Sequence, residues 1–153
     1  MVRKGVGARI AWSIESKRIK SDLADVMSGH LLDLHEFDEG ESRREAALDA
    51  YATARKAGAV TVQRFADVAT FAEAVRRTLV HRTAGELLDI IFQDSERKGV
   101  YRSTVEAVSE CAPKLLGYDG NSVLVATADA GHGVLLDLEE GALGPAVFEL
   151  ESW

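Results

Sequence analysis

The fold is decided by residues 122–153, SVLVATADAGHGVLLDLEEGALGPAVFELESW, in which three apolar runs are separated by two glycine-containing segments. The runs cover residues 122–127, 134–138 and 146–150. Short apolar runs joined by glycine turns are typical of consecutive antiparallel strands. The sequence therefore predicts a three-stranded meander at the C-terminal end of the chain.

Alternation along the second and third runs separates apolar from acidic side chains, because successive side chains of a strand point to opposite faces of the sheet. One face is expected to carry Leu136, Leu138, Phe148 and Leu150. The other face is expected to carry Asp137, Glu149 and Glu151. Like charges that face each other across two strands destabilise a sheet, and a cationic partner would relieve that repulsion.

Negative charge is concentrated in the same part of the chain. Residues 115–153 contain seven carboxylates and no lysine or arginine, so their charge of −7 equals that of the whole protein. We expect a basic protein partner to contact Asp129, Asp137, Glu139, Glu140, Glu149 and Glu151. The alternative is a solvated sheet face in an acidic protein.

The composition limits the classes of protein to which this chain can belong. A chain of 153 residues, 46% of them hydrophobic, fits one globular domain over residues 1–153. Cys111 is the only cysteine, and no apolar run approaches the ~20 residues of a membrane span. We expect a cytoplasmic protein that does not bind a membrane. An isoelectric point near 5.1 disfavours nucleic-acid binding, although residues 1–20 carry a charge of +5.

The N-terminal half shows two kinds of periodicity. Residues 9–15 alternate in polarity around Trp12, which predicts a first strand with Trp12 in the core. Apolar residues then recur every three or four positions over residues 19–34, which predicts a helix with Gly29 as a candidate interruption. The polar segment 36–41 predicts a break before a second helix that ends at Gly58, and residues 60–65 predict a short strand.

Four hydroxyl residues are each followed three positions later by glutamate, which is the pattern of a helix-capping box. The pairs are Ser42 with Glu45, Thr70 with Glu73, Thr83 with Glu86, and Ser103 with Glu106.

A helix is predicted over residues 83–98, with a buried strand at 87–92 as the alternative. Pro113 is predicted to end the helix that follows Ser103. Together the elements predict an α+β fold, in which a mostly antiparallel sheet ending in the meander packs against four or five helices.

No complete catalytic, cofactor or metal motif is present. His30 and His35 are five positions apart and do not share a helix face, unlike the two histidines of a His-Glu-x-x-His motif. Cys111 is more typical of a buried apolar residue than of a nucleophile. The best catalytic candidate is His132 in the glycine turn 129–133, although a hairpin turn requires the same glycines. We expect no enzymatic activity, no cofactor and no metal.

The segment VATADAGHGVLLDL at 125–138, followed by Glu140-Gly141 and Gly144-Pro145-Ala146-Val147, resembles the strand, glycine turn and strand of the SUKH superfamily. The resemblance covers roughly thirty residues. Many bacterial members are immunity proteins that bind and neutralise toxins, often nucleases or deaminases. The resemblance therefore implies an inhibitor.

Three functions follow as hypotheses. The first is a non-enzymatic immunity-type inhibitor, an antitoxin whose acidic residues occlude the basic cleft of a toxin. The second is a small enzyme or ligand-binding domain centred on His132. The third is a homo-oligomeric structural protein that pairs the basic N-terminal strand with the acidic sheet of a neighbour. Trp153 is either an exposed anchor for a partner or a frayed end.

Overall fold

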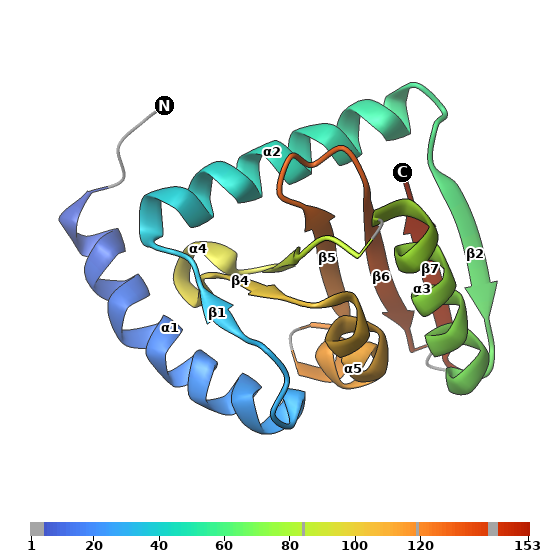
Figure 1. The fold of residues 1–153 in the computed structure, drawn as a ribbon, viewed down its shortest axis with the longest axis horizontal. Helices are drawn as coiled ribbons and strands as arrows, with labels where there is room; N and C mark the ends of the chain where they lie inside the picture. Colours follow the sequence, from blue (N-terminus) through green and yellow to red (C-terminus); the bar gives the residue numbers. More distant parts are fainter. Residues whose placement is uncertain (1–4, 84, 119, 141–143) are drawn as a thin grey trace.

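A computed structural model describes residues 5–83, 85–118, 120–140 and 144–153. The elements along the chain are α1 Val6–Met27, β1 Asp33–Leu34, α2 Phe37–Lys56, β2 Thr61–Phe65, α3 Val68–Thr83, β3 Leu88–Phe92, α4 Ser95–Lys98, β4 Val100–Ser103, α5 Val105–Tyr118, β5 Ser122–Thr127, β6 Gly133–Glu139 and β7 Val147–Ser152. Every strand pairing is antiparallel, and the seven strands form one sheet in the order β1-β4-β3-β5-β6-β7-β2 (Figure 1). The predicted α+β fold, with an antiparallel sheet and four or five helices, is confirmed.

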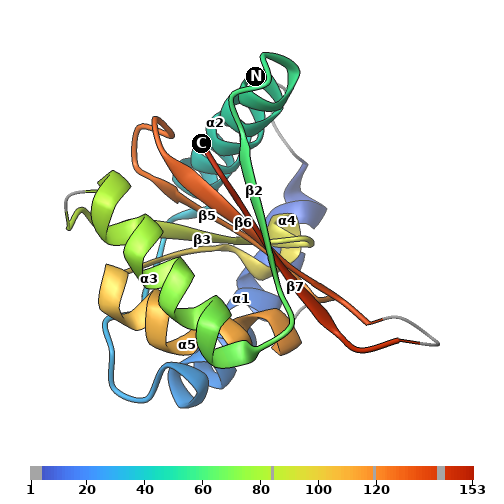
Figure 2. The same cartoon turned by 90° about the vertical axis from the view of Figure 1, so that its right-hand side faces the viewer.

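Helices cover both faces of the sheet. Helices α1, α3 and α5 lie on one face, and α2 crosses the other (Figures 1 and 2). The larger core lies on the first face and includes Leu23, Phe71, Ile90, Leu115 and Leu136. The smaller core lies under α2 and includes Ala47, Ile91, Leu124, Ala126 and Trp153. None of the helices in the described ranges is both long enough and apolar enough to cross a membrane.

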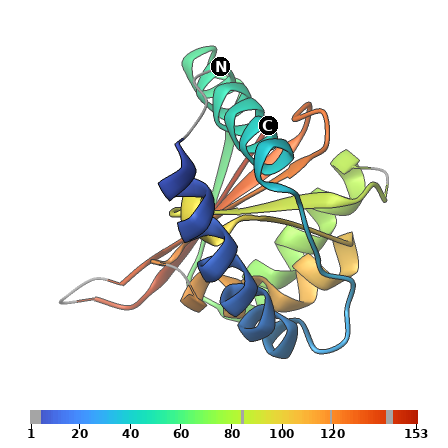
Figure 3. The same ribbon diagram turned by 90° about the vertical axis from the view of Figure 1, so that its left-hand side faces the viewer.

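The predicted meander is confirmed, because β5, β6 and β7 are consecutive neighbours in the sheet. The predicted strand at 60–65 is also present, as β2, and it pairs with the outer side of β7. Strands β6 and β7 continue past the helices as a projecting hairpin (Figures 2 and 3). Strands β1 and β4, at the opposite side of the sheet, do not follow from the sequence patterns above.

The predicted N-terminal strand is wrong, because residues 6–27 form the continuous helix α1. Its buried side chains are Ser16, Ile19, Leu23 and Met27, which recur at helical spacing. Ile10 and Ile14 are exposed, so the alternation of apolar and polar residues here does not mark a buried face of a strand. Trp12 packs edge to face on Phe37, with ring centroids 5.6 Å apart.

The predicted helix over 83–98 is also wrong, and the alternative of a buried strand is correct. Residues 88–92 form β3, in which all five side chains are buried. This strand lies between β4 and β5 and is covered on both faces, so its sequence shows no alternation. Helix α4 then occupies a single turn before Gly99.

The four predicted capping boxes are misplaced. Ser42 and Thr70 lie inside helices, Thr83 is the last residue of α3, and Ser103 is the last residue of β4. The observed caps are Asp67, which accepts from the Thr70 amide at 2.8 Å, and Thr104, which accepts from the Ala107 amide at 3.1 Å.

Two other helix boundaries differ from prediction. Segment 36–41 is largely the first turn of α2, where Asp38 and Glu39 favour the helix N-terminus electrostatically. Pro113 lies inside α5, which buries Ala112 just before the proline and Leu115 two residues after it. The burial of this helix in the core offsets part of the cost of roughly 3 kcal/mol for a proline within a helix. The predicted end of the second helix near Gly58 is confirmed, since α2 ends at Lys56 and Gly58 has a φ of 69°.

Candidate functional site

Strands β6 and β7 place two carboxylates directly opposite each other. Their register pairs Leu136 with Leu150 and Asp137 with Glu149. The leucines are buried in the larger core, whereas Asp137 and Glu149 lie on the α2 side of the sheet. The predicted separation of apolar and acidic faces is therefore confirmed. We call the α2-side carboxylates Asp137, Glu139, Glu149 and Glu151 the acidic face.

Part of this charge is compensated within the protein. Arg64 of β2 lies 2.9 Å from Glu149 through its Nε atom. Glu151 is only 5% exposed, accepts a hydrogen bond from the Tyr51 hydroxyl, and has the Arg55 guanidinium 3.6 Å away. Two guanidinium groups therefore face four carboxylates, which leaves the acidic face with an excess of negative charge.

Both burial and the neighbouring carboxylates raise the pKa of Asp137, and burial is the larger cause. Burial raises the pKa of its carboxyl, a hydrogen bond from Ser122 lowers it, and the nearby carboxylates Glu149, Glu151 and Glu139 raise it further. The charged form of Asp137 is thus disfavoured in the folded protein. A cation placed beside Asp137 would stabilise that form.

An apolar recess of about 200 Å³ lies next to the acidic face, between α2 and the sheet. Its lining residues are Leu48, Tyr51, Ile91, Ser122, Leu124 and Leu135, together with Arg44, Phe92, Gln93 and Ser95. Two of these residues join it to the acidic face, because Tyr51 donates to Glu151 and Ser122 bonds to Asp137. Leu48 is 42% exposed, so the recess presents apolar area to solvent.

The other two predicted partner-binding residues differ from this group. Asp129 lies in the turn at the opposite end of β6, where it accepts from the Gly131 amide at 2.9 Å and the Thr127 hydroxyl at 2.7 Å. These bonds lower the pKa of Asp129 and give it a turn-forming role. Glu140 is exposed just after β6, beside residues 141–143, which lie outside the described residues.

The glycine turn around His132 has a structural explanation. The backbone N–H of His132 donates to the Thr127 hydroxyl at 3.3 Å, and the His132 carbonyl accepts from the Thr127 backbone N–H at 3.0 Å. The side chain is exposed. An enzymatic or ligand-binding role for His132 stays a prediction.

The other residues considered for catalysis or metal binding have separate partners in the structure. His30 pairs with Glu110 at 2.8 Å, while His35 points to Asp89 at 2.7 Å. Burial raises the pKa of the Cys111 thiol, which disfavours the nucleophilic thiolate. Within the described ranges, no three His, Cys, Asp or Glu side chains gather in a group that could hold a metal ion.

Two features of the site are not predicted from sequence. Trp153 is buried, and its indole N–H donates to the Ala130 carbonyl, so it is neither an exposed anchor nor a frayed end. Asp89 is buried beside His35 and Arg43. Its position as the one charged residue in the apolar run 87–92 is the only sequence signal for that cluster.

No family model matches the chain, and no curated protein matches it significantly.

Proposed function

We propose that this protein is a non-enzymatic binding protein that captures a basic protein partner on the acidic face. The observation that carries the proposal is the direct opposition of Asp137 and Glu149, within a group of four carboxylates and two arginines. Maintaining such like-charge contacts costs folding stability, and a cationic partner would recover that cost.

The apolar recess supports the same proposal. Stable protein interfaces combine a desolvated apolar centre with a polar rim. Here the recess lies beside carboxylates on two strands, so one partner segment can insert an apolar side chain while its flanking lysines or arginines meet Asp137 and Glu139. Among the described residues, Asp137, Glu139 and Glu140 have no ion-pair partner.

The accessible part of the acidic face lies toward the end of β6, where Asp137 is partly exposed and Glu139 is exposed, whereas the side chains of Glu149 and Glu151 are only 14% and 7% exposed. Strands β6 and β7 reach beyond the helices (Figure 2), so this end of the acidic face can enter a concave partner site. Many enzymes that act on nucleic acid bind phosphate in a basic cleft. We therefore propose an immunity-type inhibitor that acts in the bacterial cytoplasm and blocks such a cleft in a toxin, as the SUKH resemblance implies.

The third hypothesis, self-association through a basic N-terminal strand, loses its structural premise. Residues 6–27 are helical, and Arg9 and Arg18 are engaged with Asp38 at 2.6 Å and Glu15 at 2.8 Å. Homo-oligomerisation by another surface remains compatible with the fold.

The test is affinity capture from lysate of the source organism, followed by purification of the captured protein. The Asp137→Lys/Glu139→Lys variant should bind the partner at least about tenfold more weakly, because close interfacial charge pairs couple by about 1.5–7 kcal/mol. The matched control is Glu45→Lys/Asp49→Lys, which reverses the same charge at exposed positions of α2.

Three outcomes separate binding from inhibition. The proposal is supported by two results together. The first variant alone fails to capture a basic partner, and the unaltered protein inhibits the nuclease or deaminase activity of that partner. Binding without inhibition supports a binding protein but contradicts the toxin-inhibitor role. Equal capture by both variants, or no captured basic protein at low salt, contradicts the acidic face as the binding site.

A further inference from the structure

Strand β2 forms one edge of the sheet, so part of its backbone hydrogen-bonding groups point away from β7. It pairs with β7 in a continuous five-residue register from Thr61 to Phe65, without a bulge. Natural edge strands are commonly protected by lysine, proline, a bulge or an inward-pointing charge. The sequence TVQRF has no lysine or proline, and its one charged residue, Arg64, is paired with Glu149 on the other face. This edge is therefore open to another strand.

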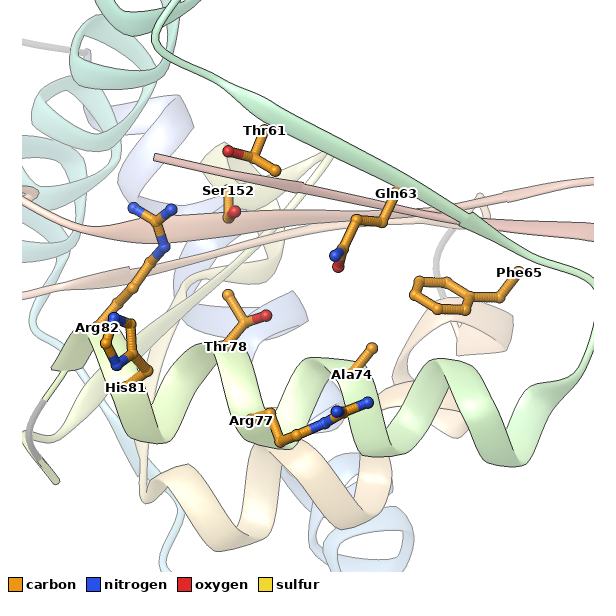
Figure 4. Close-up of a pocket in the computed structure, with 9 residues that line it drawn as sticks. All are labelled: Thr61, Gln63, Phe65, Ala74, Arg77, Thr78, His81, Arg82 and Ser152. Atoms are coloured by element: carbon orange, nitrogen blue, oxygen red, sulfur yellow. The ribbon is translucent and has the colours of Figure 1, made fainter.

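A groove of about 380 Å³ runs beside this edge, between β2 and α3 (Figure 4). Thr61, Gln63 and Phe65 project from β2 into the groove, and Ser152 of β7 lies behind them. A strand added to β2 would place every second side chain over the groove. The polar groups of Thr61 and Gln63 would then face those side chains.

The helical wall of the groove is positively charged. Arg77, His81 and Arg82 line it. The nearest carboxylate on α3, Glu73, binds Arg76 with both oxygens at 2.7 and 3.1 Å, and lies 3.8 Å from Arg77. Arg82 has no ion-pair partner among the described residues. In a protein with a net charge of −7, this groove is a local site of positive charge.

Both arginines line the groove, but they leave α3 in different directions. Arg77 and Arg82 are five residues apart, which corresponds to an axial rise of roughly 7.5 Å and a rotation of roughly 140° around the helix. Side chains two residues apart on a strand are separated by roughly 6.6–6.8 Å. Figure 4 shows β2 and α3 running side by side, with Thr61 at the Arg82 end and Phe65 at the Ala74 end. Acidic side chains on one face of an added strand would lie over the groove that both arginines line.

A compact polyanion fits the groove less well. His81 and Arg82 lie in the last turn of α3, where the helix dipole is negative, so a compact polyanion would concentrate all of its charge at an unfavourable helix end. An extended peptide spreads its carboxylates along the groove and gains backbone hydrogen bonds from β2.

We propose that β2 and the basic groove form a docking site for an extended acidic segment of another protein. The segment adds as an eighth strand beside β2 and places acidic side chains at alternate positions over the groove that Arg77 and Arg82 line. Its intervening side chains lie on the other face near Val62, which is 48% exposed, so apolar residues suit those positions. This surface is separate from the acidic face and faces the α3 side of the sheet.

The probe is a fluorescein-labelled, end-capped peptide with the core Glu-Val-Glu-Val-Glu, and the control peptide has glutamine in place of each glutamate. Fluorescence anisotropy should show saturable binding of the acidic peptide alone, and amide NMR shifts should concentrate in β2. The proposal is overturned if the labelled peptide shows no saturable binding at protein concentrations up to about 1 mM. Such a result would mean that the binding free energy is weaker than about −4 kcal/mol. Equal binding of the control peptide, or shifts outside β2 and α3, also overturns it.

Matched variants test the groove without disturbing the core. Arg77→Gln/Arg82→Gln should weaken peptide binding by about five- to twentyfold at low salt, as expected for two partly exposed ion pairs. Arg76→Gln removes a charge from the same helix outside the groove lining and should change binding less than twofold. Equal weakening by both would indicate a general charge effect and overturn the proposal.

Sedimentation of the protein alone identifies the competing occupant. A monomer at working concentration supports a foreign segment. A dimer that Arg77→Gln/Arg82→Gln dissociates would show that a second copy of this chain occupies β2, and would overturn the proposal.

Discussion

Arg43 donates from Nη1 to Oδ2 of Asp89 at 2.9 Å, which links α2 to the central strand β3. The other oxygen of Asp89 lies 2.7 Å from Nε2 of His35, in the segment between β1 and α2. The Asp89 side chain is only 3% exposed. A buried carboxylate of this kind is tolerated only because charged and polar partners surround it.

Replacing Asp89 with alanine should therefore lower the free energy of unfolding by about 3 kcal/mol, because Arg43 and His35 lose a buried partner. Urea unfolding followed by circular dichroism measures the change. The matched control is Glu39→Ala, which removes the exposed partner of the same Arg43, 2.7 Å away, and should cost less than about 1 kcal/mol. Equal losses would contradict a special role for the buried pair.

Gly133 should not tolerate a side chain. A Cβ atom there would overlap the Trp153 indole and lie 2.7 Å from the Val125 carbonyl oxygen. Gly133→Ala should therefore reduce the free energy of unfolding by about 1–3 kcal/mol, the usual cost of overpacking. Gly117→Ala, on an exposed position of α5 with nothing within 4 Å, should instead stabilise by about 0.4–1 kcal/mol. A neutral Gly133→Ala variant would show that Trp153 can move aside.

Asp137 should make the protein less stable as the pH rises. Its pKa is raised in the folded state, so the folded protein binds more protons than the unfolded chain between the two pKa values. The free energy of unfolding then falls as the pH rises through that window. Asp137→Asn should remove this slope and stabilise the protein at pH 7 by about 0.2–1 kcal/mol, the range of cross-strand pair effects. Unfolding curves from pH 3 to 8 provide the measurement.

Asp129 should behave in the opposite way. Hydrogen bonds from Gly131 and Thr127 lower its pKa, so its contribution to stability is present above the unfolded pKa and is lost as the pH falls through the folded value. Asp129→Asn should destabilise the protein at pH 7 and show little difference from the unaltered protein in strong acid. A stabilising effect at pH 7 would contradict the turn-forming role of this carboxylate.

Arg64 should limit the charge of the acidic face. Its side chain is 69% exposed and pairs with Glu149, so Arg64→Gln should change stability little. The pKa of Asp137 should rise further, because Glu149 then loses its counter-charge. NMR titration of the aspartate side chains measures this shift. Arg76→Gln is the matched control, since its partner Glu73 lies on α3, and it should leave Asp137 unchanged.

Local patterns predict the C-terminal half of the sheet better than the rest of the molecule. Strands β5 to β7 combine alternation with glycine turns, and both signals lie within 32 residues. The opposition of Asp137 and Glu149 follows directly from that alternation. Strand β3 has no such signal, because burial on both faces removes the polar positions.

Long-range contacts explain what sequence reasoning missed at the site. Arg64 meets Glu149 across 85 positions, and Tyr51 meets Glu151 across 100 positions. Both contacts depend on β2 joining β7 and on α2 crossing the sheet, which periodicity within one segment cannot specify. The placement of Asp137, Glu149 and Glu151 on one face of the sheet was therefore predicted correctly, whereas the position of Asp129 in the opposite turn and the internal counter-charges were not.

The two edges of the sheet are unequal, and this limits how the protein can assemble. Strand β1 has only two residues, Asp33 and Leu34, whereas β2 offers five. A short edge strand provides too few backbone groups to template another chain. Among the described strands, β2 is therefore the edge better suited to pair with another chain, and pairing through β2 of two copies would leave only the short β1 edges exposed.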